Sequence, residues 1–121
     1  MMNRNQVPPQ GEIVAINLIP VRAGVPVEEF AHFSATVDQP LCLAQDVVRG
    51  FEAFAVQAGG PGARDMMPID IVEVMRVRSW PEWERVRDGL PAMRPVIAGF
   101  DQLVDATAVR TLFATPIPRS R

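Results

Sequence analysis

The sequence predicts one α+β domain with the ferredoxin-like order of elements, strand, helix, strand, strand, helix, strand. Four segments rich in β-branched residues indicate strands, and two sites where proline is followed by acidic residues indicate helix starts. A glycine-rich stretch at 59–62 joins the two middle strands. In this arrangement a four-stranded antiparallel sheet carries two helices on one of its faces.

The four strands are expected at residues 12–19, 47–56, 69–77 and 108–114. In the third strand, alternation places Ile71, Glu73 and Met75 on one face, and Val72 and Val74 on the other. Both faces of this strand therefore carry apolar residues, although the two helices cover only one face. We expect a second copy of the chain to cover the other, which gives a homodimer that packs through its sheet faces.

The first helix is expected to begin at Pro26, and apolar residues at near-helical spacing mark the side that it buries. Pro40 predicts a kink or a break near its end. The second helical segment begins around Ser79 and extends to about Leu103. Its interruptions are expected at Gly89, Pro91 and Pro95.

Domain organisation follows from the prolines near each end of the sequence. Residues 1–11 are expected to form a flexible N-terminal arm, residues 12–115 the single domain, and residues 116–121 a C-terminal tail. A chain of 121 residues is long enough for one modest core.

Composition narrows the classes of function. Twelve arginines and no lysine face 14 acidic residues, for a net charge of −2, so the chain has no basic stripe and nucleic acid is not expected as a partner. No apolar run approaches the roughly 20 residues of a membrane span, and the polar start is unlike a signal peptide, so we expect a cytoplasmic protein. A single cysteine and a single histidine cannot build a Cys/His zinc site, and no metal or organic cofactor is expected.

Two groups of residues resemble a known family. The first resembles the helix end and second strand of dimeric α/β-barrel proteins, and the second resembles more specifically the RedY-like (HapK-type) family within them. The first group is residues 37–41 (VDQPL) and 46–52 (DVVRGFE); the second is residues 69–75 (IDIVEVM), 91–93 (PAM), Phe100 and 104–105 (VD). The resemblance spans residues 12–115. It implies a dimeric α/β barrel without a cofactor that acts on an aromatic intermediate of prodiginine or bisindole biosynthesis.

Glu73 and Asp38 are the candidate catalytic residues. Glu73 lies in the middle of a central strand between apolar neighbours, where burial should raise the pKa of its carboxyl into the range useful for proton transfer. The alternative is a structural acid paired with an arginine such as Arg49, Arg76 or Arg110. Asp38 lies at the edge of the apolar helix face, close enough to the sheet to meet a ligand. Its alternative role is a local capping bond before Pro40.

Five further residues are candidates for binding the substrate: Asn17, Ser34, His32, Trp83 and Met93. Asn17 could orient a ligand carbonyl, or serve as a hydrogen-bonded core residue. Ser34 lies near the buried helix face and could donate a hydrogen bond, whereas the helical spacing places His32 on the opposite, solvent side. Trp83 could stack on an aromatic ligand or pack under its helix, and Met93 could add to an apolar wall.

These residues allow three functions. The first is a cofactor-independent enzyme, in which Asp38 and Glu73 act as general acid and base to cyclise a bisindole- or pyrrole-type intermediate by dehydration or isomerisation. The second is a carrier that binds an aromatic metabolite without turning it over. The third is a cofactor-free monooxygenase or a haem-handling enzyme; the position of His32 away from the apolar helix face counts against it.

Overall fold

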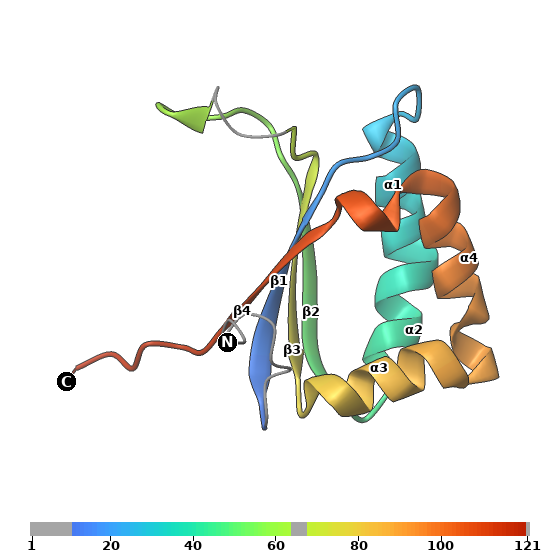
Figure 1. The fold of residues 1–121 in the computed structure, drawn as a ribbon, viewed down its shortest axis with the longest axis vertical. Coiled ribbons are helices and arrows are strands. Elements are labelled where there is room, and N and C mark those ends of the chain that lie inside the picture. The colour runs from blue at the N-terminus through green and yellow to red at the C-terminus, as the bar shows by residue number, and fades with distance from the viewer. Residues whose placement is uncertain (1–10, 64–67, 121) are drawn as a thin grey trace, which may run out of the picture.

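The computed structural model describes residues 11–63 and 68–120 and forms an antiparallel sheet with helices on one face (Figure 1). The strands are β1 (Ile13–Ile19), β2 (Val48–Ala55), β3 (Ile71–Val77) and β4 (Arg110–Ala114), in the order β2-β3-β1-β4. The ferredoxin-like topology with the third strand beside the first is thereby confirmed. Each strand is one or two residues shorter than the sequence predicts. The differences lie at the strand ends, where pattern alone places boundaries least accurately.

The first helical segment does not break at Pro40. It runs through α1 (Val27–Phe33), a π-helical turn (η2, Ser34–Asp38) and α2 (Gln39–Leu43). The N–H of Gln39 donates to the carbonyl of Ser34, five residues earlier. This wider turn lets the chain pass a proline, which has no N–H to donate and whose ring would clash in a regular α-helix. The predicted irregularity is therefore present, but it takes the form of a π-turn before Pro40.

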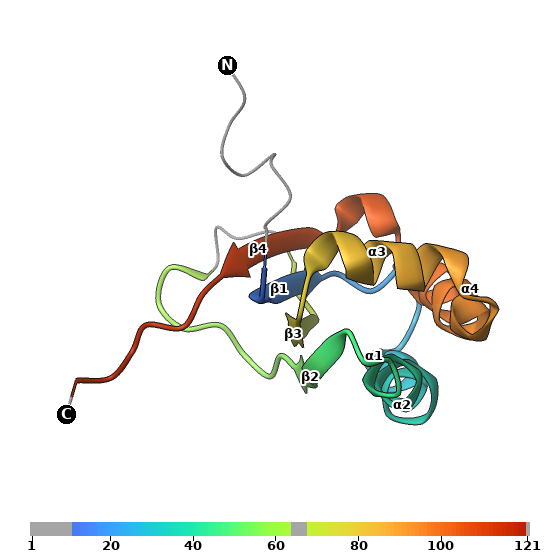
Figure 2. The same ribbon diagram turned by 90° about the horizontal axis from the view of Figure 1, so that it is seen from below.

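The second helical segment is divided where its glycine and prolines predict. It comprises α3 (Trp80–Gly89), a 3₁₀ turn (η4, Pro91–Met93) and α4 (Arg94–Leu103), and a further 3₁₀ turn (η5, Ala106–Ala108) precedes β4. Ser79 caps α3, and its hydroxyl accepts a hydrogen bond from the N–H of Glu82 at 3.3 Å. Viewed from below, α1–α2 and α3–α4 lie on the same side of the sheet (Figure 2).

The core between sheet and helices consists of two apolar clusters. One cluster includes Met75 and Trp83, and the other includes Ile71 and Phe30. Glu73 lies between Ile71 and Met75 on β3, and all three side chains are at most 4% exposed. The predicted alternation of β3 is thus observed, and a buried acid stands where the two clusters would otherwise meet.

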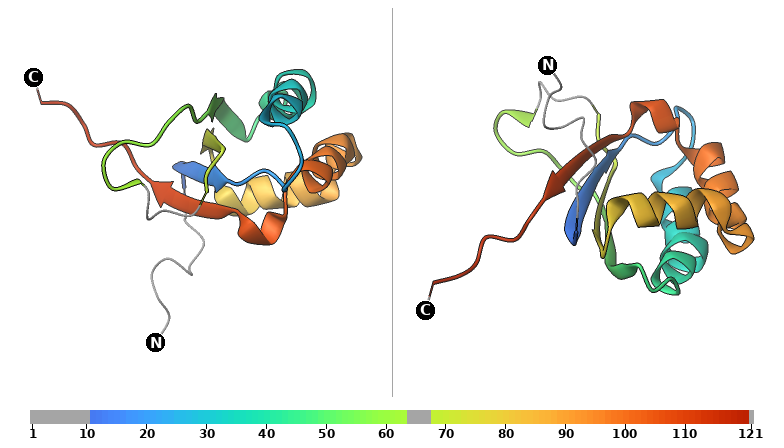
Figure 3. Two further views of the ribbon diagram at one scale, coloured as in Figure 1. Left: turned by 90° about the horizontal axis from the view of Figure 1, so that it is seen from above. Right: turned by 60° about the horizontal axis from the view of Figure 1, so that its bottom comes forward.

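The other face of the sheet carries no helix (Figures 1 and 3). Val72 and Val74 are half-buried there, and nearby Phe54 and Leu112 are 49% and 55% exposed. Residues 56–63, which follow β2, and residues 115–120 both project on this side (Figures 1 and 3). Residues 1–10 and 121 lie outside the described residues, so the flexible arm stays a prediction. No helix in the described chain has the length and apolar character to cross a membrane.

Candidate functional site

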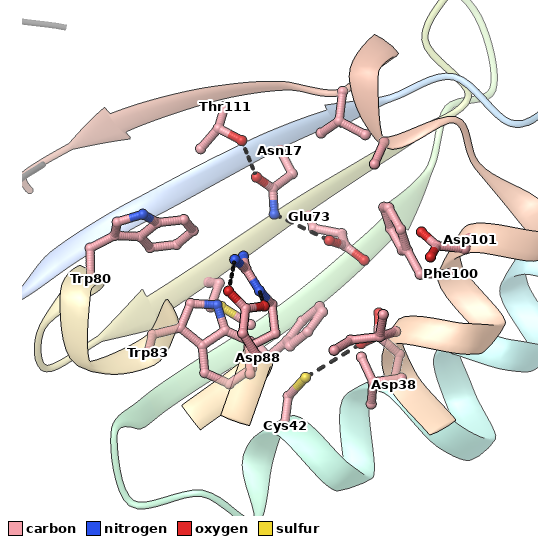
Figure 4. Close-up of a pocket in the computed structure, with 17 residues that line it drawn as sticks. Asn17, Asp38, Cys42, Glu73, Trp80, Trp83, Asp88, Phe100, Asp101 and Thr111 are labelled. Carbon is pink, nitrogen blue, oxygen red and sulfur yellow. Dashed lines mark hydrogen bonds and ion pairs between the residues drawn. The ribbon is translucent and has the colours of Figure 1, made fainter. Parts of the chain in front are cut away.

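A cavity of about 370 Å³ lies between the sheet and the helices, where the two core clusters separate (Figure 4). Its wall combines aromatic side chains with a small set of polar ones, the composition typical of sites for small organic ligands. The aromatic side chains are Phe51, Trp80, Trp83 and Phe100, and the polar ones include Asn17, Asp38, Glu73, Arg87, Asp88, Asp101 and Thr111.

Glu73 supplies a buried carboxyl at the sheet side of this cavity. It is 4% exposed, and the side-chain amide of Asn17 donates to its Oε1 at 3.3 Å. Its Oε2 is buried and has no hydrogen-bond partner among the described residues. Burial, followed by the neighbouring charge of Asp38, raises the pKa of Glu73 well above its usual range. The alternative of an arginine-paired structural acid receives no support, because the hydrogen bond to Glu73 comes from an amide.

Asp38 reaches the same cavity from the helix side. It is the last residue of the π-helical turn and is 4% exposed. The thiol of Cys42, one helical turn later, donates to Asp38 Oδ1 at 3.4 Å. The Asp38 side chain makes no capping bond to the described backbone at α2, so the local role before Pro40 is not observed. Burial raises the pKa of Asp38, and the hydrogen bond from Cys42 partly offsets that rise.

The two carboxyls influence each other in opposite directions. A protonated Glu73 can donate towards Asp38, which raises the pKa of Glu73 and lowers that of Asp38. Glu73 therefore holds the proton more tightly, and Asp38 is the first of the pair to ionise. Two neighbouring acids with separated affinities can divide the roles of proton donor and acceptor. Burial also raises the pKa of the Cys42 thiol, which keeps it protonated as a donor to Asp38.

A row of polar residues crosses the sheet at Glu73. Asn17 on β1 lies opposite Glu73 on β3 and opposite Thr111 on β4. The hydroxyl of Thr111 donates to Asn17 Oδ1 at 2.7 Å, and Asn17 Nδ2 in turn donates to Glu73 Oε1 (Figure 4). Asn17 is thus anchored on both sides and lines the cavity.

Helix α3 forms a further wall. Trp83 is 3% exposed and belongs to the core cluster, so it both packs under its helix and lines the cavity. Trp80 is half-buried and meets the ring of Phe113 edge-on, with centroids 4.9 Å apart. Arg87, one turn beyond Trp83, is held by Asp88, with Nε 2.8 Å from Oδ1. The α3 wall therefore offers aromatic surface beside an anchored charge pair.

Three of the predicted binding residues lie away from the cavity wall. His32 is exposed on α1, as the helical spacing predicts. Ser34 is buried and accepts a hydrogen bond from the side chain of Gln39 at 2.9 Å, which occupies it within its own helix. Met93 is fully buried in the core cluster. Of the seven predicted site residues, Asp38, Glu73, Asn17 and Trp83 line the cavity.

Thr111 and Arg87 line the cavity although sequence reasoning did not select them. Thr111 is an ordinary residue in an edge strand, and only the pairing of β4 with β1 connects it to Asn17. Arg87 follows Trp83 by four residues, so helical spacing places both on one side of α3 and could have found it. Among the described residues, no group of three His, Cys, Asp or Glu side chains could hold a metal ion.

Comparison with solved structures supports the fold. HapK from Hahella chejuensis has a TM-score of 0.69 at 14% sequence identity, over 90% of this chain and 96% of that one. A dimeric ferredoxin-like protein of unknown function from Thermobifida fusca has a TM-score of 0.64 at 13% identity, over 95% of this chain and 100% of that one. SnoaB from Streptomyces nogalater, described as a cofactor-independent oxygenase, has a TM-score of 0.63 at 12% identity, over 90% and 96% of the two chains.

The sequence itself matches a family model. No curated protein gives a significant match to it. The model of the REDY-like protein HapK, however, matches residues 13–117, which include every strand and helix of the fold. This chain therefore belongs to the REDY-like HapK family.

Proposed function

We propose that this protein is a cofactor-independent acid–base enzyme of natural-product biosynthesis. It would cyclise an aromatic intermediate of the bisindole or pyrrole type, by dehydration or isomerisation. One observation carries this proposal: Asp38 and Glu73 line one aromatic cavity, and both carboxyls have raised pKa values because both are buried. Membership of the HapK family supports the biosynthetic context.

The two acids have distinct roles in the proposed reaction. Glu73, which holds its proton more tightly, is the general acid and gives that proton to a carbonyl or a departing hydroxyl of the substrate. Asp38, which ionises first, is the general base and removes a proton from carbon or nitrogen. In a dehydration the hydroxyl leaves as water, and a proton passing from Asp38 to Glu73 restores the starting state. Each proton transfer contributes roughly 10²–10⁴-fold in rate.

The cavity wall supports an aromatic substrate. Trp80 and Phe100 are partly buried ring systems at the cavity, and Trp83 contributes a third. Aromatic side chains bind flat ring systems through large buried contact area and edge-to-face contacts. The volume of about 370 Å³ lies within the range of small-molecule sites.

The test is turnover of bisindole and bipyrrole compounds by the purified protein, followed by mass spectrometry. We expect a product that has lost one water or is an isomer of the substrate. Glu73→Gln and Asp38→Asn should each lower turnover by about 10²-fold or more while binding persists, because these variants keep the shape of the side chain and remove its proton chemistry. Ser34→Ala, which alters a buried polar residue of the same helix off the cavity wall, is the matched control and should keep turnover.

Two alternatives give different results in the same experiment. A carrier, favoured by the apolar part of the wall, would bind the compounds without product in the wild type and in both variants. A monooxygenase, favoured by the structural likeness to SnoaB, would consume oxygen and give a product with an added oxygen. Either result would overturn the acid–base proposal.

We also propose that the protein is a homodimer, joined through the sheet face that no helix covers. Half-buried Val72 and Val74 lie on that face with the more exposed Phe54 and Leu112, and the similar Thermobifida fusca protein is described as dimeric. A stable dimer buries roughly 1,000 Å² or more in total. Size-exclusion chromatography with light scattering should give twice the chain mass, and Val74→Arg should give the monomer. A wild-type monomer would refute this assembly.

A further inference from the structure

Resting on the proposed acid–base function, we propose that Thr111 is a positioning residue that acts through Asn17. By fixing the amide of Asn17, it selects Oε2 of Glu73 as the oxygen that carries the proton and delivers it into the cavity. This assigns a part in proton transfer to an edge-strand threonine whose hydroxyl donates to Asn17 and not directly to Glu73 or Asp38.

The argument begins with strand register. Asn17 is the direct cross-strand partner of both Thr111 and Glu73, so the three side chains stand in one row on the helix-facing side of the sheet. Thr111 Oγ1 lies 2.7 Å from Asn17 Oδ1, and Asn17 Nδ2 lies 3.3 Å from Glu73 Oε1. The shorter of the two contacts is the one made by Thr111.

The orientation of the amide follows from its two ends. A hydroxyl that donates to Oδ1 holds the carbonyl of Asn17 towards β4, which turns the NH₂ group towards Glu73. Oε1 of Glu73 then accepts a hydrogen bond from this NH₂ group, which disfavours a proton on that oxygen. Oε2 is buried without a partner among the described side chains, so the proton of a neutral Glu73 belongs there.

A reversed amide would misdirect the proton. With Oδ1 facing Glu73, the carbonyl would accept a hydrogen bond from a protonated Oε1, and Glu73 would donate along the sheet towards β1. Thr111 prevents this by supplying the donor that keeps Oδ1 occupied. The hydroxyl of Thr111 thus determines which oxygen of Glu73 carries the proton. A proton on Oε1 would be shared with the sheet, whereas a proton on Oε2 is available to Asp38 and to substrate.

Other titratable groups also line the cavity. They are Asp38 on η2, Cys42 on α2, Arg87 and Asp88 on α3, and Asp101 on α4. Of these, only Asp38 contributes to the raised pKa of Glu73, and it raises it, as burial does. The amide of Asn17 has the opposite effect, since it stabilises the ionised carboxylate.

The test compares Thr111→Val with Thr111→Ser. Valine keeps the shape and favours a strand but has no hydroxyl, whereas serine keeps the donor. The side-chain carboxyl carbons of ¹³C-labelled protein are titrated by NMR, with Glu73→Gln for assignment. In Thr111→Val the freed amide can turn and accept a hydrogen bond from protonated Glu73, which stabilises the neutral carboxyl, so the pKa of Glu73 should rise by about half a pH unit. Thr111→Ser should keep the wild-type pKa.

The outcomes separate this inference from the proposed function. A raised wild-type pKa that rises further in Thr111→Val, with rescue by Thr111→Ser, supports the positioning role. A raised wild-type pKa that is the same in all three proteins overturns the role of Thr111 and leaves the acid–base enzyme intact. A wild-type Glu73 that titrates near its ordinary value of about 4.3 overturns both. Once a substrate is known, Thr111→Val should shift the alkaline limb of the pH–rate profile, because that limb reports the loss of the proton from the general acid Glu73. A purely structural change would leave this limb in place.

Discussion

Replacing Glu73 by glutamine should change how the stability of the protein depends on pH. A buried carboxyl with a raised pKa keeps its proton in the folded state at pH values where the unfolded chain has already lost it. Stability contributed by this proton is complete below the unfolded pKa of about 4.3 and is lost as pH rises through the folded pKa. Glutamine is neutral at every pH and nearly the same shape, so Glu73→Gln lacks this loss.

The size of the effect follows from the linkage between protons and folding. For each pH unit between the unfolded and the folded pKa, one proton changes the free energy of unfolding by about 1.4 kcal/mol. Glu73 is only 4% exposed, so solvent screens this effect weakly. Wild type and Glu73→Gln should therefore match near pH 4, and the variant should become the more stable by about 1.4 kcal/mol for every unit by which burial and Asp38 raise the pKa.

Urea unfolding at a series of pH values, at one protein concentration, measures this difference through tryptophan fluorescence. Glu12→Gln, which removes an exposed carboxylate beside β1, is the control and should follow the wild-type curve. In Asp38→Asn, the loss of stability due to Glu73 should span a narrower pH range than in the wild type. The variant lacks the charge of Asp38, which raises the pKa of Glu73. Parallel curves for wild type and Glu73→Gln would refute the reasoning, since they would mean that Glu73 ionises freely in the folded protein.

Three further predictions concern a glycine of α4 and two residues of the cavity wall. Gly99→Ala should destabilise the protein by about 1–3 kcal/mol in urea unfolding, because the added Cβ would overlap the ring of Phe33; an unchanged midpoint would mean that the ring moves freely. Cys42→Ala should raise the pKa of Asp38 in an NMR titration, because the carboxylate loses a hydrogen-bond donor, and an unchanged value would exclude that donor. Trp80→Ala should weaken binding of indole, measured by calorimetry, and equal affinity would place the ligand elsewhere.

Most of the fold could be predicted from the sequence because its signals are local. Strand alternation and proline positions depend only on neighbouring residues, and they gave the element order, the central third strand and the buried face of Glu73. The continuous passage through Pro40 could not be predicted. It depends on a π-turn, in which the bond from Gln39 to Ser34 replaces the regular α-helical pattern. That turn also sets the rotation of the helix at Asp38.

The candidate site depends on contacts between distant segments, and this part was only partly predictable. Asp38 and Glu73 are each recognisable as acids in apolar surroundings, but their common cavity requires both the rotation of the helix and the register of β3. Thr111 has no local signal at all, because its importance comes from pairing with Asn17, which lies 94 residues away in the sequence. Ser34 and Met93 are buried as their positions suggest, yet burial alone did not distinguish core from cavity wall.

The division of the core explains why a structural role for Glu73 is the weaker interpretation. An apolar residue at this position would join the cluster around Met75 to the cluster around Ile71 and would stabilise the fold. A structural acid would have its charge balanced by an arginine, whereas Glu73 has an amide on one oxygen and a second acid nearby. The buried acid, its amide partner and the nearby second acid each cost stability. Each of them also helps to keep a proton available inside an aromatic cavity. Proton transfer to a bound ligand is a role that requires these three features together.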